Sequence, residues 1–169
     1  MTARSSPEVP MRVHLRPATA KDVGALVPLL VRLKRLNEEF DPLLRVRDDA
    51  AERAEEILKE DLESSHALVL AVEGTGTDKG KIVGVVRAHV RDRNFYAPER
   101  EGVILDIYLL PIYRRHGVGE YVLRETTQRL KDKGAGIVVA EFPAQNEIAA
   151  RFYQKRGYRP LTSHHARSV

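Results

Sequence analysis

The order in which strand-like and helix-like hydrophobic patterns follow one another is the feature that most constrains the fold of this chain. Apolar alternation or short apolar runs predict strands at Arg12–Arg16, Ala67–Val72, Ile82–Val90, Val103–Leu110 and Gly136–Ala140. Apolar residues three or four apart predict helices at 19–33, Asp48–Leu62, Gly117–Lys133 and Asn146–Lys155. A last short strand is expected after Gly157. The order β-α-α-β-β-β-α-β-α-β predicts an α+β fold, with a mixed, mostly antiparallel sheet flanked by helices and one β-α-β crossover near the C-terminal end.

The first helix carries a start signal and an interruption. Thr19 is the expected N-cap, with Asp22 three residues later. Pro28 breaks the apolar pattern and leaves two readings open, a kinked helix or a helix that starts late.

The length of 169 residues favours one domain, which we expect over residues 11–169. Residues 1–10 contain serines and prolines without hydrophobic periodicity, so we expect a flexible tail there. Met11 is a second candidate for the start of translation.

Composition excludes several classes of protein. The sequence has no cysteine, which excludes disulfide scaffolds, thiolate nucleophiles and Cys-ligated metal centres. Its six histidines show no metal-ligand spacing, so we expect no metal. No apolar run approaches the ~20 residues that cross a bilayer, and the first residues lack the hydrophobic stretch of a secretion signal. We therefore expect a cytoplasmic enzyme or binding domain without a membrane partner.

Charged residues are segregated along the chain. Residues 48–63 hold eight acidic and two basic residues, whereas residues 151–169 hold five Lys or Arg and no acid. The basic segment suggests an anionic partner such as a phosphate, a nucleotide or a nucleic acid. A solvated charged surface is the alternative reading of either run.

One glycine-rich segment resembles a phosphate loop only superficially. Gly74–Lys81 (GTGTDKGK) lacks the first glycine of the Walker pattern, and Ile82 stands where that pattern needs a hydroxyl. The segment also joins two predicted strands rather than a strand and a helix. We interpret it as a turn.

The segment Arg114–Gly119 (RRHGVG) joins a predicted strand to a predicted helix. Free amides at a helix N-terminus bind anions, and Gly117 and Gly119 let the backbone approach phosphate oxygens closely. Arg114 and Arg115 add positive charge at the same place. These features predict a pyrophosphate cradle; a glycine-rich turn with surface arginines is the alternative.

Two motifs in the C-terminal half resemble the GNAT N-acetyltransferases. Tyr108–Gly119 (YLLPIYRRHGVG) is similar to the acetyl-CoA loop of that family, whose pattern is Arg/Gln-x-x-Gly-x-Gly/Ala. Asn146–Tyr158 (NEIAARFYQKRGY) is similar to the family's last motif, an Asn, a short helix with Phe-Tyr and then Gly-Tyr/Phe. The resemblance covers about 103–160 and implies a GNAT-type fold with acetyl-CoA as cosubstrate.

The resemblance also implies roles for residues of the first motif. The strand end, with Tyr108, Leu109 and Leu110, would hold the pantetheine arm through the backbone of the two leucines, and one of their amides would polarise the thioester carbonyl. The following segment would wrap the pyrophosphate: Arg114, Arg115, His116, Gly117, Val118, Gly119 and Glu120.

The second motif would supply groups near the reacting end of the coenzyme. Asn146 would contact the coenzyme, and Tyr153 would act as general acid for the departing thiolate. Ordinary pKa values of ~10 for Tyr and ~8.5 for a thiol make full proton transfer unfavourable by about 2 kcal/mol. Tyr153 would therefore hydrogen-bond the developing thiolate or need a lowered pKa; core packing is the alternative role.

The general base is expected on the central strand. Alternation predicts that Ile104, Asp106 and Tyr108 share one face of this strand. A carboxylate among apolar neighbours has to be paired or functional, and GNAT enzymes often use an acid near this position. Asp106 is the first candidate and Glu141 the second. Alternatively, Asp106 is a structural hydrogen-bond acceptor.

The leading interpretation is an acyl-CoA-dependent N-acetyltransferase that transfers acetyl to a primary amine by direct attack in a ternary complex. The amine would belong to a small molecule, a protein lysine or a protein N-terminus. A non-catalytic CoA-binding regulatory module is the second hypothesis, and a basic nucleic-acid-binding domain is the third and least supported. The chain ends nine residues after Pro160, so the last strand would be short or completed by a second subunit, as in a homodimer.

Overall fold

The computed structural model describes residues 12–169, so the predictions for residues 1–10 and for Met11 lie outside the described part of the chain. Within it, the strands are β1 (Val13–Pro17), β2 (Ala67–Gly74), β3 (Ile82–Asp92), β4 (Arg100–Leu109) and β5 (Ile137–Ala140). The α-helices are α1 (Val23–Glu38), α2 (Ala50–Glu63), α3 (Val118–Asp132) and α4 (Glu147–Gln154).

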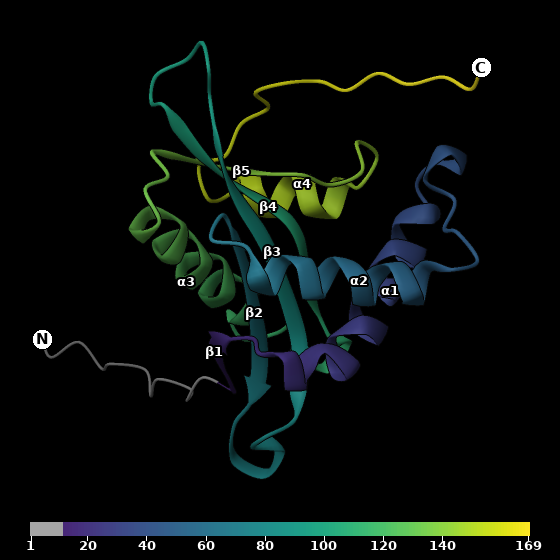
Figure 1. The fold of residues 1–169 in the computed structure, drawn as a ribbon, viewed down its shortest axis with the longest axis vertical. Coiled ribbons are helices and arrows are strands. Elements are labelled where there is room, and N and C mark those ends of the chain that lie inside the picture. The colour runs from purple at the N-terminus through teal and green to yellow at the C-terminus, as the bar shows by residue number, and fades with distance from the viewer. Residues whose placement is uncertain (1–11) are drawn as a thin grey trace, which may run out of the picture.

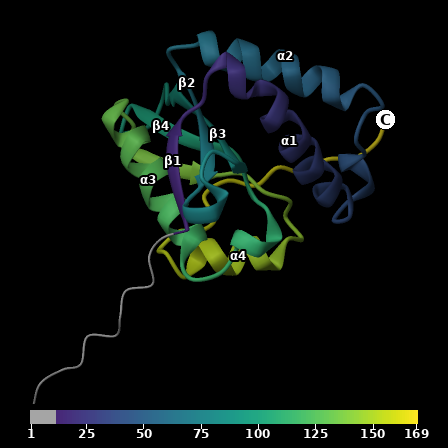
Figure 2. The same ribbon diagram turned by 90° about the horizontal axis from the view of Figure 1, so that it is seen from below.

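The strands form a single sheet in the order β1-β2-β3-β4-β5. All neighbours are antiparallel except β4 and β5, which are parallel and joined by α3. Figures 1 and 2 show α1 and α2 on one face of the sheet and α3 and α4 on the other. Two apolar clusters fill these layers, one beneath α1 and α2 and one beneath α3 and α4.

The predicted α+β fold with a mostly antiparallel sheet and one crossover is therefore confirmed. The predicted last strand is wrong: residues 158–169 form no strand, and Arg159 onward is exposed to solvent. Pro160 has no amide hydrogen to donate to a neighbouring strand. Figure 1 shows this segment running away from α4 as an extended trace.

The first helix begins where the sequence predicts. The Thr19 amide donates to the carboxylate of Asp22 at 2.8 Å, and a 3-10 turn at Ala20–Asp22 leads directly into α1. The helix starts five residues before Pro28, so the late-start reading is wrong. Pro28 is tolerated on the exposed side of α1, while Leu26 and Leu30 are buried against the sheet.

A β-bulge in β4 changes which residues share a face. Arg87 of β3 is opposite Asp106, but the next residue, Ala88, is opposite Ile104, so Leu105 is an extra residue in β4. Ile104 packs in the cluster beneath α3, whereas Tyr108 packs beneath α1 and α2. The prediction that Ile104 shares a face with Asp106 and Tyr108 is wrong, because the bulge shifts the alternation by one residue.

Candidate active site

The sheet opens between β4 and β5 at one end. The two strands pair from Glu101–Ile137 to Ile104–Ala140, and the last contact is the Glu141 amide donating to Ile104 at 3.0 Å. Beyond this point β4 continues through Leu109 while the chain after β5 turns away. The residues 105–109 of β4 therefore have a sheet neighbour on one side only.

Backbone direction decides which amides face this open edge. The Leu110 amide donates to the Val83 carbonyl at 2.9 Å, so it points into the sheet. Because successive amides along a strand point to opposite edges, those of Leu109 and Ile107 point to the open edge. Leu110 cannot be the oxyanion donor without leaving the sheet, and Leu109 remains a candidate. Ile107, which the sequence analysis did not name, is a second candidate, and alternation from Leu109 would have found it.

A short turn at Pro111–Tyr113 connects β4 to the predicted phosphate loop. His116 and Gly117 both have positive φ, 59° and 74°, and α3 starts directly after them at Val118. A left-handed residue next to a right-handed one brings neighbouring amides together as an anion-binding nest, and Gly117 followed by the helical Val118 has this pattern at a helix N-terminus. The loop geometry therefore suits a pyrophosphate.

The two arginines of this loop point in different directions. Arg114 folds back on the strand, where its Nε donates to the Leu109 carbonyl at 2.8 Å and its guanidinium lies 5.1 Å from the centre of the Tyr108 ring. Arg115 and His116 instead line an open cavity of about 400 Å³ beside the loop. Arg12 lines the same cavity, which the sequence analysis did not foresee. Positive charge thus surrounds the loop, but the side chain of Arg114 faces the strand end.

The hairpin between β2 and β3 contacts the short turn that leads into the predicted phosphate loop. Tyr113 is buried, and its hydroxyl donates a hydrogen bond to the carboxylate of Asp78 in that hairpin. Lys81 holds the same carboxylate at 2.8 Å. The interpretation of Gly74–Lys81 as a turn is consistent with the structure, and the turn contributes an anchor for the segment leading into the loop.

Tyr153 lies in an aromatic cluster on α4. Its ring stacks on Phe142 at 5.3 Å and meets the edges of Phe152 and Tyr158 at 5.2 and 5.1 Å. Burial, with a smaller contribution from Tyr158, raises the pKa of Tyr153 well above its ordinary value. The direction of this shift is opposite to the lowered pKa that was one of the two expectations, hydrogen-bond donation to a departing thiolate stays a prediction, and the buried ring in this cluster fits the alternative role in core packing.

The structure also places three further residues of the predicted coenzyme site. Asn146 caps α4, its Oδ1 accepting from the Ala149 amide at 3.0 Å, which leaves Nδ2 to donate to a ligand. A Cβ on Gly119 would lie 3.3 Å from the Phe152 ring, so this glycine permits close packing of α3 on α4. Tyr108 is buried on the other side of the sheet, beneath α1 and α2. Its hydroxyl has no hydrogen-bond partner among residues 12–169.

Asp106 belongs to a chain of ion pairs on the α1 and α2 side of the sheet. Its fully buried carboxylate is bound by Lys34 of α1 and, at 2.7 Å, by Nη1 of Arg87. Arg87 also binds Asp61 of α2 at 2.5 Å, and His89 lies 2.8 Å from the same carboxylate. Burial alone would lower the pKa of Arg87, but Asp106 and Asp61 raise it above the ordinary value.

These contacts make Asp106 a structural acceptor, and the role of general base stays a prediction. Glu141, the second candidate, is exposed at the end of β5 and lies 3.7 Å from Arg91. The Glu141 carboxylate is therefore more accessible to solvent than that of Asp106, and its ion pair is longer.

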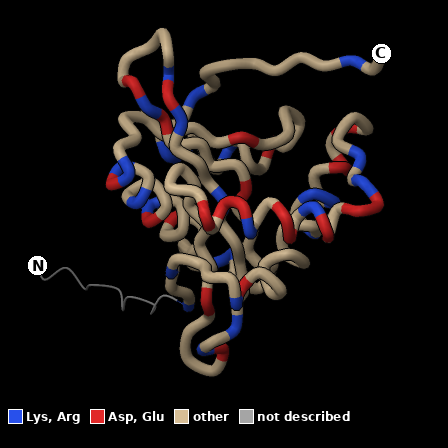
Figure 3. The backbone as a smooth tube through the Cα atoms, viewed as in Figure 1, with Lys and Arg blue, Asp and Glu red and all other residues tan. Residues whose placement is uncertain are grey.

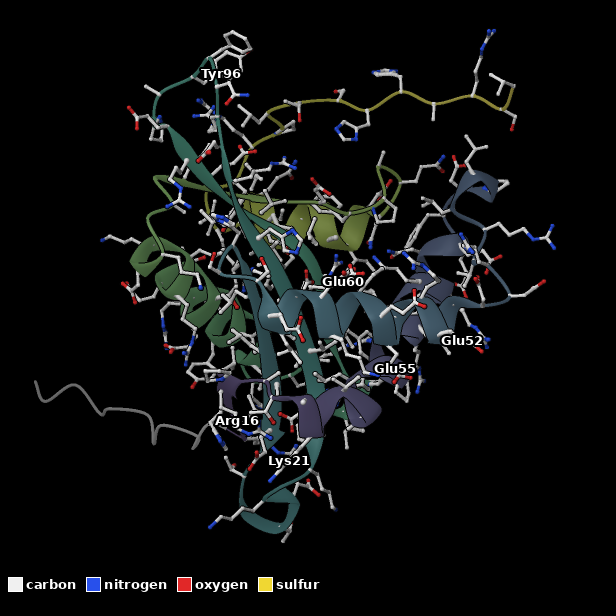
Figure 4. The ribbon with its side chains drawn as sticks, in the orientation of Figure 1. Arg16, Lys21, Glu52, Glu55, Glu60 and Tyr96 are labelled. Atoms are coloured by element: carbon white, nitrogen blue, oxygen red, sulfur yellow. The ribbon has the colours of Figure 1, made fainter. Side chains whose placement is uncertain are left out.

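The acidic run of α2 faces solvent, with one exception. Glu52, Glu55 and Glu60, labelled in Figure 4, are exposed, and only Asp61 turns inward. Figure 3 shows basic and acidic residues interspersed over the elements instead of one large basic face. Neither run of charge therefore identifies a partner.

Two observations bear on metals and membranes. Among residues 12–169 no three His, Asp or Glu side chains are grouped so as to hold a metal ion. No helix in this part of the chain combines the length and apolar character needed to cross a membrane.

Comparison with known proteins supplies a family. The model of the acetyltransferase (GNAT) family matches residues 32–158. A search of curated proteins finds no match.

Several solved structures share the fold. A predicted acetyltransferase from Clostridium acetobutylicum, solved with acetyl-CoA, is 16% identical with a TM-score of 0.73 and covers 92% of this chain and 96% of its own. An aminoglycoside N-acetyltransferase solved with CoA is 17% identical with a TM-score of 0.71, covering 100% and 99%. Ribosomal-protein-alanine N-acetyltransferase from Brucella melitensis is 18% identical with a TM-score of 0.70, covering 93% and 99%.

Proposed function

Because this chain belongs to the GNAT family of acetyltransferases, we propose that it transfers an acetyl group from acetyl-CoA to a primary amine by direct attack in a ternary complex. One observation carries this proposal: the open edge of β4 leads directly into the nest at the start of α3. The pantetheine arm of acetyl-CoA is extended and leads to a pyrophosphate. This shape fits a strand edge that is followed by an anion-binding loop.

The groups that would hold the coenzyme are mostly backbone. The amides at the start of α3, around Gly117 and Gly119, would bind the pyrophosphate, with Arg115 adding positive charge and His116 a ring N–H donor. The amide and carbonyl of Leu109 would pair with the pantetheine arm. Arg114 holds that carbonyl at 2.8 Å, so it would have to release it when the arm pairs there.

The reaction needs stabilisation of charge at two atoms. Acetyl-CoA, when bound, supplies the acetyl group as an activated thioester. Only one of the two amides directed to the open edge, that of Ile107 or that of Leu109, would donate to the developing oxyanion, because residues two apart on a strand are about 6.6 Å apart, and the other would pair with the pantetheine arm. Tyr153 would donate a hydrogen bond to the leaving sulfur, since its raised pKa keeps the phenol protonated. Asp106 or Glu141 would accept the amine proton, directly or through water.

The acceptor class stays open between small-molecule amines and protein amines. Fold relatives include an aminoglycoside N-acetyltransferase and a ribosomal-protein-alanine N-acetyltransferase, so the fold supports both classes equally. The acids of α2 other than Asp61 face solvent, so their charge gives no argument for a cationic acceptor.

Calorimetric titration with acetyl-CoA, using ATP and NAD as controls, tests the donor site. We expect saturable binding of acetyl-CoA alone and, with a panel of amines, release of free CoA thiol. Binding without release from any amine would favour a CoA-binding regulatory module. No binding at millimolar acetyl-CoA would overturn the proposal and favour a nucleic-acid-binding surface.

A further inference from the structure

Lys34 brings an amine of the protein itself to the proposed reaction site. Its Nζ forms an ion pair with Oδ1 of Asp106, although the two residues are 72 positions apart in sequence. The Lys34 side chain remains 43% exposed, while the carboxylate that binds it is completely buried. The Lys34 side chain is therefore held at its ammonium end by a buried acid, while part of the side chain is exposed to solvent.

The position of Asp106 connects this amine to the open edge of β4. Asp106 lies two residues beyond Ile104, where the pairing with β5 ends, and directly before Ile107, a proposed oxyanion donor. Consecutive Cα atoms are about 3.8 Å apart. The carboxylate that binds Lys34 and the amide proposed to polarise the thioester carbonyl thus belong to neighbouring residues of β4, although the Asp106 side chain points to the α1 and α2 face and the Ile107 amide to the open edge.

We propose that Lys34 is a substrate of this protein, acetylated on Nζ within its own chain by the bound coenzyme. This inference rests on the proposed function, because it uses the same donor site. The flexible four-carbon stem of Lys34 allows Nζ to turn from Asp106 to the neighbouring edge. A nucleophile held about 3–3.5 Å from its target reacts far faster than the same group in free solution.

The transfer balances without a further reagent. The Lys34 ammonium loses one proton to Asp106 or to water, and the neutral amine attacks the thioester carbonyl. The N–C bond forms and the C–S bond breaks. The thiolate takes the second amine proton and leaves as free CoA thiol, so one proton is released to solvent overall. The product lacks the Lys34 charge, and Asp106 is then paired with Arg87 alone.

Lys59 provides a matched control. It also binds a carboxylate, that of Glu55 one turn earlier on α2, but its side chain is 60% exposed and Glu55 faces solvent. General chemical acetylation follows exposure and should favour Lys59. Acetylation from the donor site should favour Lys34.

The experiment compares two acetyl donors on the full chain by peptide-resolved mass spectrometry. With acetyl-CoA we expect Lys34 to be modified roughly tenfold faster than Lys59, at a rate independent of protein concentration. With acetic anhydride and no coenzyme we expect Lys59 to react first. Lys34→Arg, which keeps the ion pair with Asp106, should abolish the acetyl-CoA-dependent mark, and Lys59→Arg should leave it.

The same order of reactivity with both donors would overturn the proposal, and so would a rate that rises with protein concentration. Acetyl-CoA binding is measured in the same samples by thermal unfolding. Stabilisation by acetyl-CoA without the Lys34 mark would sink this inference and leave the proposed function intact. If acetyl-CoA neither stabilises the protein nor acetylates Lys34, this inference and the proposed function are both overturned.

Discussion

At the scale of single residues, the buried acids of the described chain are held by arginine. Arg16 binds both oxygens of Asp22, and Arg87 bridges Asp61 and Asp106. A buried carboxylate without a partner would be costly, so each acid depends on its arginine. The two pairs differ in setting: that of Asp22 anchors the start of α1, and that of Asp106 lies beside the proposed reaction site.

Asp22→Asn should lower the free energy of unfolding by about 1–2 kcal/mol at pH 7, because it weakens the bonds to Arg16. Arg16 first, then Thr19, hold the pKa of Asp22 well below its ordinary value, against the effect of burial. A lowered folded-state pKa stabilises the protein above the unfolded pKa of ~3.9, and the benefit is lost as the pH falls further.

Urea unfolding at pH 7, 4 and 2.5 measures this effect. The difference between the wild type and Asp22→Asn should shrink below pH 4. Asp49→Asn, which weakens an exposed pair with Arg47, should produce no measurable change. A difference for Asp22→Asn that stays constant with pH would contradict the assignment.

Tyr153→Phe should lower the rate of acetyl transfer about 100-fold and leave the Kd for acetyl-CoA nearly unchanged, because only the hydrogen bond to the leaving sulfur is lost. Since the Tyr153 pKa is raised, the wild-type rate should show no loss from tyrosine ionisation up to about pH 10. Tyr158→Phe keeps the neighbouring ring and serves as control. Unchanged turnover of Tyr153→Phe would remove this residue from the mechanism.

At the scale of elements, the end of β4 is shaped by its neighbour β3. Gly84 lies opposite Leu109, and a Cβ at Gly84 would lie 2.6 Å from the Tyr108 carbonyl oxygen and 2.7 Å from the Leu109 side chain. A glycine at this position lets the two strands approach where the coenzyme arm is proposed to pair. The bulge at Leu105, four residues earlier, turns Asp106 and Tyr108 toward α1.

Gly84→Ala should therefore lower the free energy of unfolding by about 1–3 kcal/mol and raise the Kd for acetyl-CoA, because β4 must move. Gly24→Ala is the matched control. Gly24 lies in α1 with nothing within 4 Å of an added Cβ, so alanine should stabilise the protein by about 0.5–1 kcal/mol. Chemical unfolding and calorimetric titration measure both quantities. Equal effects of the two substitutions would contradict the role of Gly84.

At the scale of the whole molecule, the ion-pair chain connects four elements of the fold. Lys34 comes from α1, Asp106 from β4, Arg87 from β3 and Asp61 from α2. The helical layer and the sheet thus meet through charges as well as through the apolar cluster beneath α1 and α2. Figure 2 shows this layer on the side of the sheet opposite α3 and α4.

Arg87→Met should destabilise the whole fold by about 3–5 kcal/mol, because it removes a shared partner of two buried carboxylates. Arg91→Met, on the same strand, removes a half-exposed pair with Glu101 and should cost less than about 1 kcal/mol. Urea unfolding measures both variants. A small loss for Arg87→Met would mean that Lys34 and His89 are sufficient to compensate these acids.

Much of the fold could be predicted from the sequence because its signals are local. The strands of the central sheet begin and end within a few residues of their predicted bounds, since apolar alternation reports directly which backbone faces are buried. Thr19 and Asp22 mark the start of the first helical turn through contacts three residues apart. The glycine-rich loop before α3 was identified because glycines and arginines between a strand and a helix form a local pattern, and Gly117 there has a positive φ of 74°.

Other features depended on contacts distant in sequence. The bulge at Leu105 arises from how β4 pairs with β3, so the face of Ile104 could not be derived from β4 alone. The last strand was predicted but does not form, because a strand requires a neighbour to pair with, and the chain from Arg159 onward has none in the described structure.

The sequence by itself therefore determined the order of the elements as far as α4, the position of the glycine-rich loop before α3 and the family resemblance, all of which depend on spacing along the chain. Only the tertiary structure decided that the Ile107 and Leu109 amides face the open edge, that Lys34 lies on Asp106 and that burial raises the pKa of Tyr153. The physical reason is that amide direction, ion pairing and desolvation depend on which distant segments come together. Spacing along the chain does not specify which segments these are.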